Sequence, residues 1–405
     1  MTTDTRIIEP AVLTKTATIL AKRFGSAVSI CSAIFISRPE RRNALIRVTL
    51  NDQGNALPKT VIVKQTITEG SDINGHEALE RLAKDWAGLE CLRDVSLKFP
   101  LVPQFYGGSI TNRFIVLEDL GDVHASLVDA LTGTDKTEGE AALERYTTAL
   151  GLLHGLAHGN IKHYQSILSK LKPEAMVWQD ELDHMLTKIA SVLGRFGISL
   201  DSAQKNEINN VFKIVKDAGP FTTLIHGDIC PDNVFDDPKN GRMRIIDFEW
   251  SFVGNALLDG VYMRMCMPTC WCAKAIPDDV IARCELLYRK ELIKNMPAAK
   301  NDKVYYESYA AACAYWMICH VGYVTEIWDK DSDLSDPKYL NLHPKWRPED
   351  NLRRPRVLYR IEAFIEMAKK HDALPQLLSL AEKVLSELKV LWPETEPLGY
   401  YPAFI

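Results

Sequence analysis

The feature that most constrains this chain is a short β-rich island inside a long region of helical spacing. The island has the sequence FTTLIHGDICPDNVFDDPKNGRMRIIDFEW and covers residues 221–250. β-Branched and aromatic residues predict strands around a polar loop, His226–Asp232, and a turn through Lys239-Asn240-Gly241 favours a hairpin after it. The predicted strands are 221–225, 233–236 and 243–248, and helices are predicted at 141–158, 173–195, 202–217, 278–294, 302–328 and 356–390.

Asn233 and Asp247 lie near the two ends of the predicted hairpin and are candidate metal ligands. A three-residue turn with a left-handed glycine would place them opposite each other on one face. A two-residue Asn-Gly turn would shift the register and place them on opposite faces. Amide and carboxylate oxygens are the hard ligands that Mg²⁺ requires, so the first register predicts a magnesium site.

Asp228 lies in the polar loop, five residues before Asn233. In the kinase template a catalytic Asp is followed by a metal-binding Asn, and a second metal-binding Asp comes later in the chain. Asp228 is therefore the candidate group that orients a substrate hydroxyl and accepts its proton. The later acid is Asp247, and Glu249 stands where a protein kinase has the glycine of D-F-G.

The first 120 residues predict a smaller, sheet-rich lobe. Single cores rarely grow past about 250–300 residues, so a chain of 405 residues is long enough for two lobes. We expect an α+β fold with an N-terminal nucleotide-binding lobe, 1–120, and a larger, mainly helical catalytic and substrate-binding lobe, 121–405. The first lobe has predicted helices at 12–24 and 76–92 and predicted strands at Val28–Ile36, Ala44–Leu50, Thr60–Gln65 and Arg113–Glu118.

Composition narrows the class of protein. A net charge of −5 argues against nucleic acid as the main partner. Nine cysteines, an odd number scattered through the chain, favour free thiols in a reducing compartment. The start of the chain shows no secretion signal, and the longest apolar run, Ala310–Val324, predicts a buried helix rather than a membrane span. We therefore expect a cytoplasmic protein with no membrane partner, and the oligomeric state stays open.

The segments HGDICPDN, at 226–233, and IIDFE, at 245–249, together resemble the aminoglycoside phosphotransferase/choline kinase family. Members of that family have a two-lobed, protein-kinase-like fold and phosphorylate small molecules with ATP or GTP. The similarity runs from about residue 28 to residue 265 and continues more weakly through the C-terminal helices. GNALLDGVY, at 254–262, resembles the structural segment that follows the metal-binding motif in this family.

The resemblance implies a role for each residue of these motifs. Asp228 would be the catalytic base, and His226 would support the loop that carries it. Asn233 and Asp247 would bind the metal. Glu249 would aid metal or substrate binding, because choline kinases also have an acid two residues after the metal-binding Asp.

Lys64 is the only lysine inside a predicted strand of the smaller lobe, and a buried ammonium there needs an acidic partner. In the kinase template this lysine grips the α- and β-phosphates and pairs with an acid on the following helix. By position Asp85 is the favoured partner, although relatives usually carry Glu. Glu77, Glu80 and Glu90 are the alternatives.

Two further nucleotide contacts are predicted in this lobe. The loop SRPERRN, at 37–43, has no glycine, so its backbone cannot approach phosphate as a glycine-rich loop does, and Arg38, Arg41 or Arg42 would reach phosphate instead. The resemblance places Glu118, Asp119 and Leu120 at the hinge, where backbone groups would bind the purine base.

Three other clusters suggest chemistry but favour structural roles. His154 and His158 lack the glutamate of H-E-x-x-H, and CMPTCWC, at 266–272, has no fourth zinc ligand at finger spacing. Buried packing is the favoured interpretation of its cysteines. An aromatic group at 315–328 could form a cation–π pocket for an amine, but its helical spacing favours plain core.

We therefore predict an ATP- or GTP-dependent phosphotransferase that uses Mg²⁺ and moves the γ-phosphate to a hydroxyl of a small molecule. An amino alcohol, an aminoglycoside-like compound and a sugar-like compound all fit as acceptors. The alternatives are a catalytically silent kinase-like scaffold or sensor, which the glycine-free loop favours, and an enzyme of the same fold that transfers a nucleotidyl group.

Overall fold

The computed structural model describes residues 6–51, 57–68, 72, 75–95, 100–122, 125–172, 179–331 and 343–405. The chain forms two compact units. The sheet unit contains Met1–His124, Asn160–Ala175 and Arg244–Ser251. The helical unit contains Ala125–Gly159, Met176–Met243 and Phe252–Ile405. The sheet unit is therefore built from three separate stretches of sequence.

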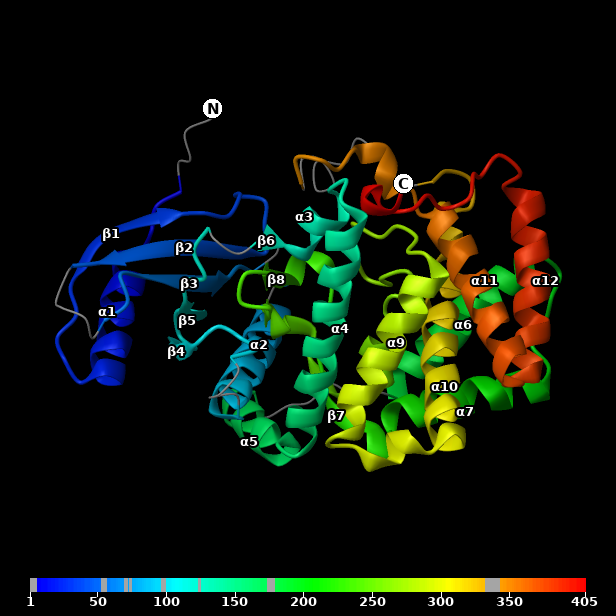
Figure 1. Ribbon diagram of the computed structural model, residues 1–405, viewed down its shortest axis with the longest axis horizontal. Coiled ribbons are helices and arrows are strands. Elements are labelled where there is room, and N and C mark those ends of the chain that lie inside the picture. The colour runs from blue at the N-terminus through cyan, green and yellow to red at the C-terminus, as the bar shows by residue number, and fades with distance from the viewer. Residues whose placement is uncertain are drawn as a thin grey trace. The chain divides into compact units, whose positions relative to one another are not determined.

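A five-stranded antiparallel sheet with the order β1-β2-β3-β5-β4 forms the centre of the sheet unit (Figure 1). The ladders place Lys64 between Leu45 on one neighbouring strand and Ile115 on the other. Lys64 is thus in a central strand, where its side chain must point to one face of the sheet. The strands are β1 (Ile30–Phe35), β2 (Asn43–Leu50), β3 (Thr60–Thr66), β4 (Phe105–Ser109) and β5 (Phe114–Glu118).

One face of this sheet packs against helix α1 (Pro10–Phe24) and forms an apolar core. Alternate residues of β2 are buried, as expected for a strand with one covered face. Because Val61 and Val63 belong to this core, Lys64 projects from the other face. The core contains Val12, Leu20, Ile46, Val48, Leu50, Val61, Val63, Phe114 and Val116.

Helix α2 (His76–Val95) supplies the partner of Lys64 and packs against two segments from later in the chain. One is helix α5 (Ile161–Leu171), joined to α2 by an ion pair between Lys172 and Glu80 at 2.7 Å. The other is a short 3₁₀ turn, η3 (Phe248–Trp250), whose first side chain is fully buried. A Cβ atom added to Gly88 of α2 would lie 2.9 Å from Cβ of Phe248, so only glycine permits this packing.

The helical unit is dominated by long helices around α10 (Asp302–Gly322), whose residues from Ser308 onward are nearly all buried. The apolar run at 310–324 is therefore largely a buried helix, as predicted. No helix among the described residues is long and apolar enough to cross a membrane. The other long helices are α4 (Lys136–His158), α6 (Gln179–Arg195), α7 (Ser202–Lys216), α9 (Asp278–Ile293), α11 (Arg354–His371) and α12 (Pro375–Leu391), and the shorter ones include α3 (Leu127–Leu131) and α8 (Leu257–Gly260).

The predicted hairpin is present, because the strands at Val234–Asp237 and Arg242–Ile245 are neighbours in one sheet, but the bounds of its strands differ from the prediction. Strand β7 (Thr222–Ile225) pairs with β10 (Phe252–Asn255), a strand that the sequence did not predict. Asn233 ends a 3₁₀ turn that begins at Pro231, so strand β8 (Val234–Asp237) starts one residue later than predicted. Strand β9 (Arg242–Ile245) ends early because Asp247 adopts a left-handed conformation, with φ of 70°.

Asn233 and Asp247 consequently lie outside the strands, and neither of the two predicted registers describes them. The helix predicted at 356–390 is also divided. Asp372 and Leu374 have positive φ angles, and Pro375 then begins α12. The predicted class is confirmed: the protein is α+β, with a small antiparallel sheet and a mainly helical remainder.

Replacing Gly88 by valine should destabilise the sheet unit, because the new side chain overlaps the position of Phe248. Overpacking of this kind costs about 1–3 kcal/mol in unfolding free energy. Urea unfolding of the variant and the wild type would measure the difference. Gly159→Ala is the matched control, since a Cβ there meets no atom within 4 Å, and equal losses in the two variants would contradict the packing.

Candidate active site

Lys64 forms the centre of a charged cluster within the sheet unit. Its Nζ lies 2.7 Å from Oδ2 of Asp85 on α2 and 2.5 Å from Oδ1 of Asp247. Lys64 is 7% exposed and Asp85 is 2% exposed, so both charges are removed from water. The sequence-based choice of Asp85 over Glu77, Glu80 and Glu90 as the partner of Lys64 is confirmed.

These contacts determine the protonation of the lysine. Burial alone would lower the pKa of Lys64, but the charges of Asp247 and Asp85 outweigh it and raise that pKa above its usual value. Burial also raises the pKa of Asp85, to about 6, against the opposing effect of the Lys64 charge. Lys64 is therefore a fixed cation, which suits a group that binds phosphate.

Asp85 has a second function, because it also holds the backbone that carries Asp247. The amide of Phe248 donates a hydrogen bond of 2.8 Å to Oδ1 of Asp85. One carboxylate thus pairs with Lys64 through Oδ2 and fixes the segment after Asp247 through Oδ1. This support helps to keep Asp247 in a left-handed conformation, which is unusual for any residue other than glycine.

Glu249 is buried, and both of its oxygens contact the beginning of β2. Oε2 accepts a hydrogen bond of 2.9 Å from Nδ2 of Asn43, and Oε1 lies 3.2 Å from the guanidinium of Arg42. Arg42 also lies over the ring of Trp250. The glycine-free loop at 37–43 is therefore anchored at its end by Glu249, and metal binding by this carboxylate would cost one of these contacts.

The predicted hinge residues lie at the end of β5. Oε2 of Glu118 accepts a hydrogen bond of 3.0 Å from the amide of Gln104. Asp119 pairs with Arg47 of β2 at 2.7 Å and accepts a hydrogen bond from the amide of Gly121. Glu118 and Leu120 are thus on a well-fixed strand end, and their contact with a purine base stays a prediction.

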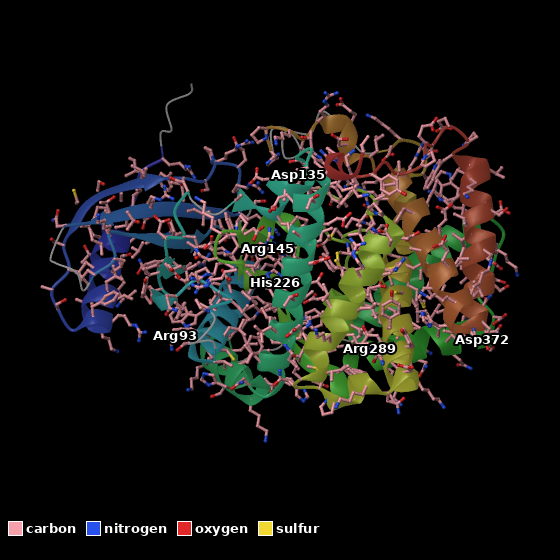
Figure 2. The ribbon with its side chains drawn as sticks, viewed as in Figure 1. Arg93, Asp135, Arg145, His226, Arg289 and Asp372 are labelled. Atoms are coloured by element: carbon pink, nitrogen blue, oxygen red, sulfur yellow. A yellow bond between two sulfur atoms is a disulfide. The ribbon has the colours of Figure 1, made fainter. Side chains whose placement is uncertain are left out.

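In the helical unit a buried carboxylate, Asp259 of α8, holds the beginning of the loop 226–233. Oδ2 of Asp259 accepts a hydrogen bond of 2.6 Å from the amide of His226, and Oδ1 accepts one of 3.1 Å from the amide of Gly227. His154 lies 3.2 Å from the same carboxylate and 2.8 Å from the hydroxyl of Tyr288. His226, labelled in Figure 2, thus has a supporting position, and its Nδ1 accepts from the amide of Asp228.

Asp228 and Asn233 are brought together by this loop. Nδ2 of Asn233 donates a hydrogen bond of 2.9 Å to the carbonyl oxygen of Asp228 and lies 3.5 Å from Oδ2 of its carboxylate. Oδ1 of Asp228 accepts a hydrogen bond from the hydroxyl of Thr269. Since Asn233 uses its nitrogen as a donor, its amide oxygen is the atom left to act as an acceptor or a metal ligand.

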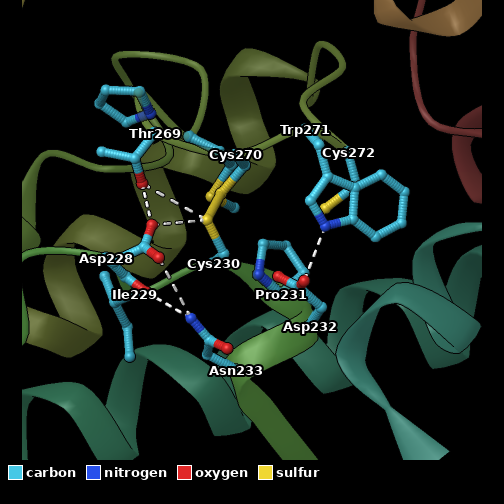
Figure 3. The surroundings of a disulfide bond; sticks show 12 residues. Asp228, Ile229, Cys230, Pro231, Asp232, Asn233, Thr269, Cys270, Trp271 and Cys272 are labelled. Atoms are coloured by element: carbon cyan, nitrogen blue, oxygen red, sulfur yellow. Dashed lines mark hydrogen bonds between the residues drawn. A yellow bond between two sulfur atoms is a disulfide. The ribbon is translucent and has the colours of Figure 1, made fainter. Parts of the chain in front are cut away.

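The structure corrects the expectation that the cysteines are free thiols. Cys230, inside the loop, forms a disulfide with Cys270, and their Cα atoms are 5.4 Å apart (Figure 3). Cys266 and Cys272 are buried free cysteines, in agreement with the packing role predicted for them. Sequence spacing could not have found the disulfide, because it does not indicate which of three neighbouring cysteines pairs with Cys230.

The histidine pair His154 and His158 and the aromatic group at 315–328 make contacts that stabilise the fold. Nδ1 of His158 lies 2.7 Å from the carbonyl oxygen of Thr222. Nε1 of Trp316 donates to the carbonyl oxygen of Leu258, and Lys188 lies over the ring of Tyr323. These contacts are those of packed residues, and the described residues contain no group of three His, Cys, Asp or Glu side chains that could hold a metal ion.

A magnesium ion is chemically compatible with two of the predicted ligands. Asn233 offers an amide oxygen and Asp247 a carboxylate, and both are hard oxygen donors. Their positions also follow the order of the kinase template, in which the Asn comes from the catalytic loop and the Asp from the later motif. Glu249 fits less well, because its oxygens already contact Asn43 and Arg42.

Comparison with known proteins identifies the family. The phosphotransferase enzyme family (APH) matches residues 78–284, which is just over half of the chain. The chain belongs to this family. It is therefore a small-molecule phosphotransferase with a protein-kinase-like α+β fold, as the motifs at 226–233 and 245–249 implied. The match includes Asp85, Asp228, Asn233 and Asp247, whereas Lys64 lies before it.

Two solved structures illustrate the similarity. An ethanolamine kinase from Plasmodium vivax is 12% identical, with 82% of this chain and 82% of that chain covered and a TM-score of 0.44. A choline/ethanolamine kinase family protein from Mesorhizobium loti is 14% identical, with 93% and 99% covered and a TM-score of 0.42. A comparison with curated proteins finds no match.

The predicted site residues thus form two groups. Lys64, Asp85 and Asp247 meet within the sheet unit, and Glu249 is anchored close by in sequence. His226, Asp228 and Asn233 meet within the helical unit. Sequence analysis missed Thr269, which has no motif of its own and reaches Asp228 through the fold.

Replacing Asp259 by alanine should destabilise the loop 226–233, because it leaves two backbone amides and His154 without their buried acceptor. The loss of unfolding free energy should be about 3 kcal/mol or more. Denaturant unfolding would measure it, with Asp217→Ala, an exposed residue after α7, as the control. A loss no larger than that of the control would contradict the role of Asp259.

Replacing Lys64 by methionine should destabilise the protein more at pH 8 than at pH 5. Burial already raises the pKa of Asp85 to about 6 in the wild type, where the Lys64 charge opposes it, so removing that charge should raise the pKa further. A carboxyl with a raised folded-state pKa is stable when protonated, so stability falls as pH rises from the unfolded pKa of about 4 through the folded one. In the wild type Lys64 has a raised pKa and stays charged throughout this range.

Urea unfolding at the two pH values would test this, and the deficit of Lys64→Met should grow by about 1 kcal/mol or more, which corresponds to one unit of pKa. The matched control is Lys59→Met, an exposed residue just before β3. A deficit that does not change with pH would show that Asp85 is not controlled by Lys64.

Proposed function

We propose that this phosphotransferase moves the γ-phosphate of ATP or GTP, bound with Mg²⁺, to a hydroxyl of a small molecule. The observation that carries the proposal is the buried Lys64 ammonium held between Asp85 and Asp247. A lysine buried on a sheet and paired with two carboxylates is an expensive arrangement for stability alone. It is the arrangement that the kinase template uses to bind the phosphates and the metal.

The residues of the sheet unit would bind the nucleotide. Lys64 supplies a fixed positive charge to the phosphates, and Asp85 fixes its position. Glu118 and Leu120 would offer backbone groups to the purine base. Arg42, with its side chain 41% exposed, is the arginine of the glycine-free loop that Glu249 orients, and it would supply a charge at the phosphates in place of backbone amides.

The residues of the helical unit would act on the acceptor. Asp228 is the proposed base, and His226 supports the loop that carries it. Because Oδ1 of Asp228 already accepts a hydrogen bond from Thr269, we assign Oδ2 as the oxygen that takes the proton of the acceptor hydroxyl. Orientation of the hydroxyl, rather than covalent chemistry, would provide most of the effect of this group.

Asn233 and Asp247 would hold the metal through their oxygens. A bound Mg²⁺ supplies charge neutralisation to the phosphate groups. Turnover in this proposal therefore depends on both groups of residues. We propose an amino alcohol, an aminoglycoside-like compound or a sugar-like compound as the acceptor, and the cytoplasm as the place of the reaction.

Replacing Asp228 by asparagine should abolish turnover and leave nucleotide binding intact, because the amide keeps the shape of the side chain but cannot accept a proton. Replacing Asp247 by asparagine should weaken the binding of Mg-ATP as well. Binding would be measured as the thermal shift with ATP and GTP, each with and without Mg²⁺. A ligand at 100 times its Kd adds about 2.7 kcal/mol to the stability. Turnover would be measured as ADP formation with a panel of hydroxyl compounds.

Asp237→Asn is the matched control, since it removes the same charge at the last residue of β8 and should change neither quantity. Wild-type turnover in Asp228→Asn would rule out the proposed base. A missing nucleotide shift in the wild type would favour the silent scaffold instead. A nucleotidyl group on the acceptor, detected by mass spectrometry, would show a different reaction.

A further inference from the structure

A second loop of the helical unit contacts the proposed base. We call residues 265–272 the Thr269 segment, and Figure 3 shows its residues Thr269 to Cys272 beside the loop that carries Asp228. The hydroxyl of Thr269 donates a hydrogen bond to Oδ1 of Asp228 and is itself in contact with the hydroxyl of Tyr262. Trp271 donates a hydrogen bond of 2.7 Å to Asp232 of the loop 226–233, which also carries Asp228. The two loops therefore meet at several points.

The start of the Thr269 segment is held by a buried arginine of α11. Arg360 donates to the carbonyl oxygens of Met265 at 2.9 Å, Cys266 at 2.8 Å and Met267 at 3.3 Å. Burial lowers the pKa of Arg360, to about 10. Cys266 and Met267 have φ angles of 53° and 44°, which side chains rarely adopt. Positive φ angles and a buried arginine both cost stability. The contacts with Arg360 hold this turn in one conformation despite that cost.

The rest of the segment is held in a similar way. Arg356, another buried residue of α11, donates to the carbonyl oxygens of Trp271 at 2.8 Å and Cys270 at 3.4 Å. Nε2 of His320 lies 2.9 Å from the carbonyl oxygen of Pro268. The residue that these contacts leave exposed is Thr269, and the segment presents it to Asp228.

The Cys230–Cys270 disulfide is the covalent link between the two loops. Cys230 lies two residues after Asp228, and Cys270 directly follows Thr269. Sγ of Cys230 is 3.1 Å from Oδ1 of Asp228. A disulfide sulfur has no hydrogen to donate, so in this state the hydroxyl of Thr269 donates to that oxygen and the sulfur does not.

We propose that Thr269 is a positioning residue for Asp228, and that Cys230 and Cys270 form a reversible redox site that keeps it in place. This inference rests on the proposed function, because it assigns Asp228 as the base. The disulfide form is the faster enzyme, since it holds both loops around one orientation of the carboxylate. The dithiol form is slower, since the covalent link is lost.

The chemistry of the switch is a thiol–disulfide exchange with a dithiol reductant. The reductant forms an internal disulfide and gives two electrons and two protons, the Cys230–Cys270 bond breaks, and each sulfur becomes a thiol. Cys230 then has a hydrogen that competes with Thr269 for Oδ1 of Asp228. The sulfur atoms are buried, with Cys230 3% and Cys270 5% exposed, so attack requires the Thr269 segment to open.

A reversible role fits the cytoplasmic location that we propose for the reaction. In a reducing cytoplasm a disulfide seldom serves as a permanent support, and those that form are usually catalytic or redox-sensing. The Cys230–Cys270 disulfide lies beside the proposed base, next to the residue whose hydroxyl contacts that base. This position fits a redox-sensing disulfide. The seven other cysteines form no disulfide. Cys230 and Cys270 are therefore the disulfide-bonded pair among the residues described.

The first experiment uses the native protein and dithiothreitol as the reductant. Alkylation followed by mass spectrometry counts the free thiols, and ADP formation from Mg-ATP, with water as the acceptor, measures turnover. We expect seven free thiols before reduction and nine after it. With reduction kcat should fall about tenfold, the equivalent of one hydrogen bond, while KM for Mg-ATP changes little. Reoxidation should restore kcat.

The control Cys31→Ser, which removes an exposed thiol of β1, should respond to reduction as the wild type does. Cys270→Ser should be slow and should no longer respond. Hydrogen exchange should become faster at 228–233 and 268–272 on reduction, which is a readout independent of activity. Nine free thiols in the untreated protein, resistance of the bond to the reductant, or equal kcat in both forms would each overturn the redox site.

The positioning role is tested by two substitutions that keep the disulfide. Thr269→Val should lower kcat to about the level of the reduced enzyme, because it removes the hydroxyl but keeps the shape. Thr269→Ser should restore it, and KM for Mg-ATP should change little in either variant. Equal activity of the valine and serine variants would overturn the role of Thr269. Retained turnover in Asp228→Asn would instead overturn the proposed function, so the two failures can be told apart.

Discussion

The ammonium of Lys64 is the charge on which the sheet unit depends. It is buried on the face of the sheet opposite the apolar core, and it is stable there only because Asp85 and Asp247 neutralise it. These three residues lie on a strand, a helix and a turn from separate parts of the chain. One electrostatic requirement therefore fixes the positions of all three elements, and it does so at the place where phosphate would bind.

A comparable requirement shapes the helical unit, with a carboxylate in place of the ammonium. Asp259 is fully buried and accepts hydrogen bonds from two successive backbone amides of the loop that carries Asp228. The loop therefore depends on a residue outside it as well as on its own side chains, His226 and Asn233. The position of the proposed base therefore depends on Asp259.

Sequence analysis succeeded where local pattern and chemistry agree. Runs of β-forming residues predicted the strands around Lys64, and position on the following helix selected Asp85 as the partner of the buried ammonium. Sequence analysis failed where a tertiary contact determines the conformation of the backbone. Strand β10 has only four residues and pairs with a strand about thirty residues earlier, and β9 stops because of the left-handed Asp247. Thr269 and the Cys230–Cys270 pair depend on a loop whose shape is set by distant arginines, which no local pattern reveals.

The division of the sheet unit among three stretches of sequence has a consequence for how the protein is made. The chain passes between the units five times, and the last stretch of the sheet unit ends at Ser251. On the ribosome, the first 124 residues would emerge with Lys64 and Asp85 in place but without Asp247 and Phe248. The lobe nearest the N-terminus is thus completed only after more than half of the chain has been synthesised, and a fragment cut at residue 124 would carry a buried cation with half of its counter-charge.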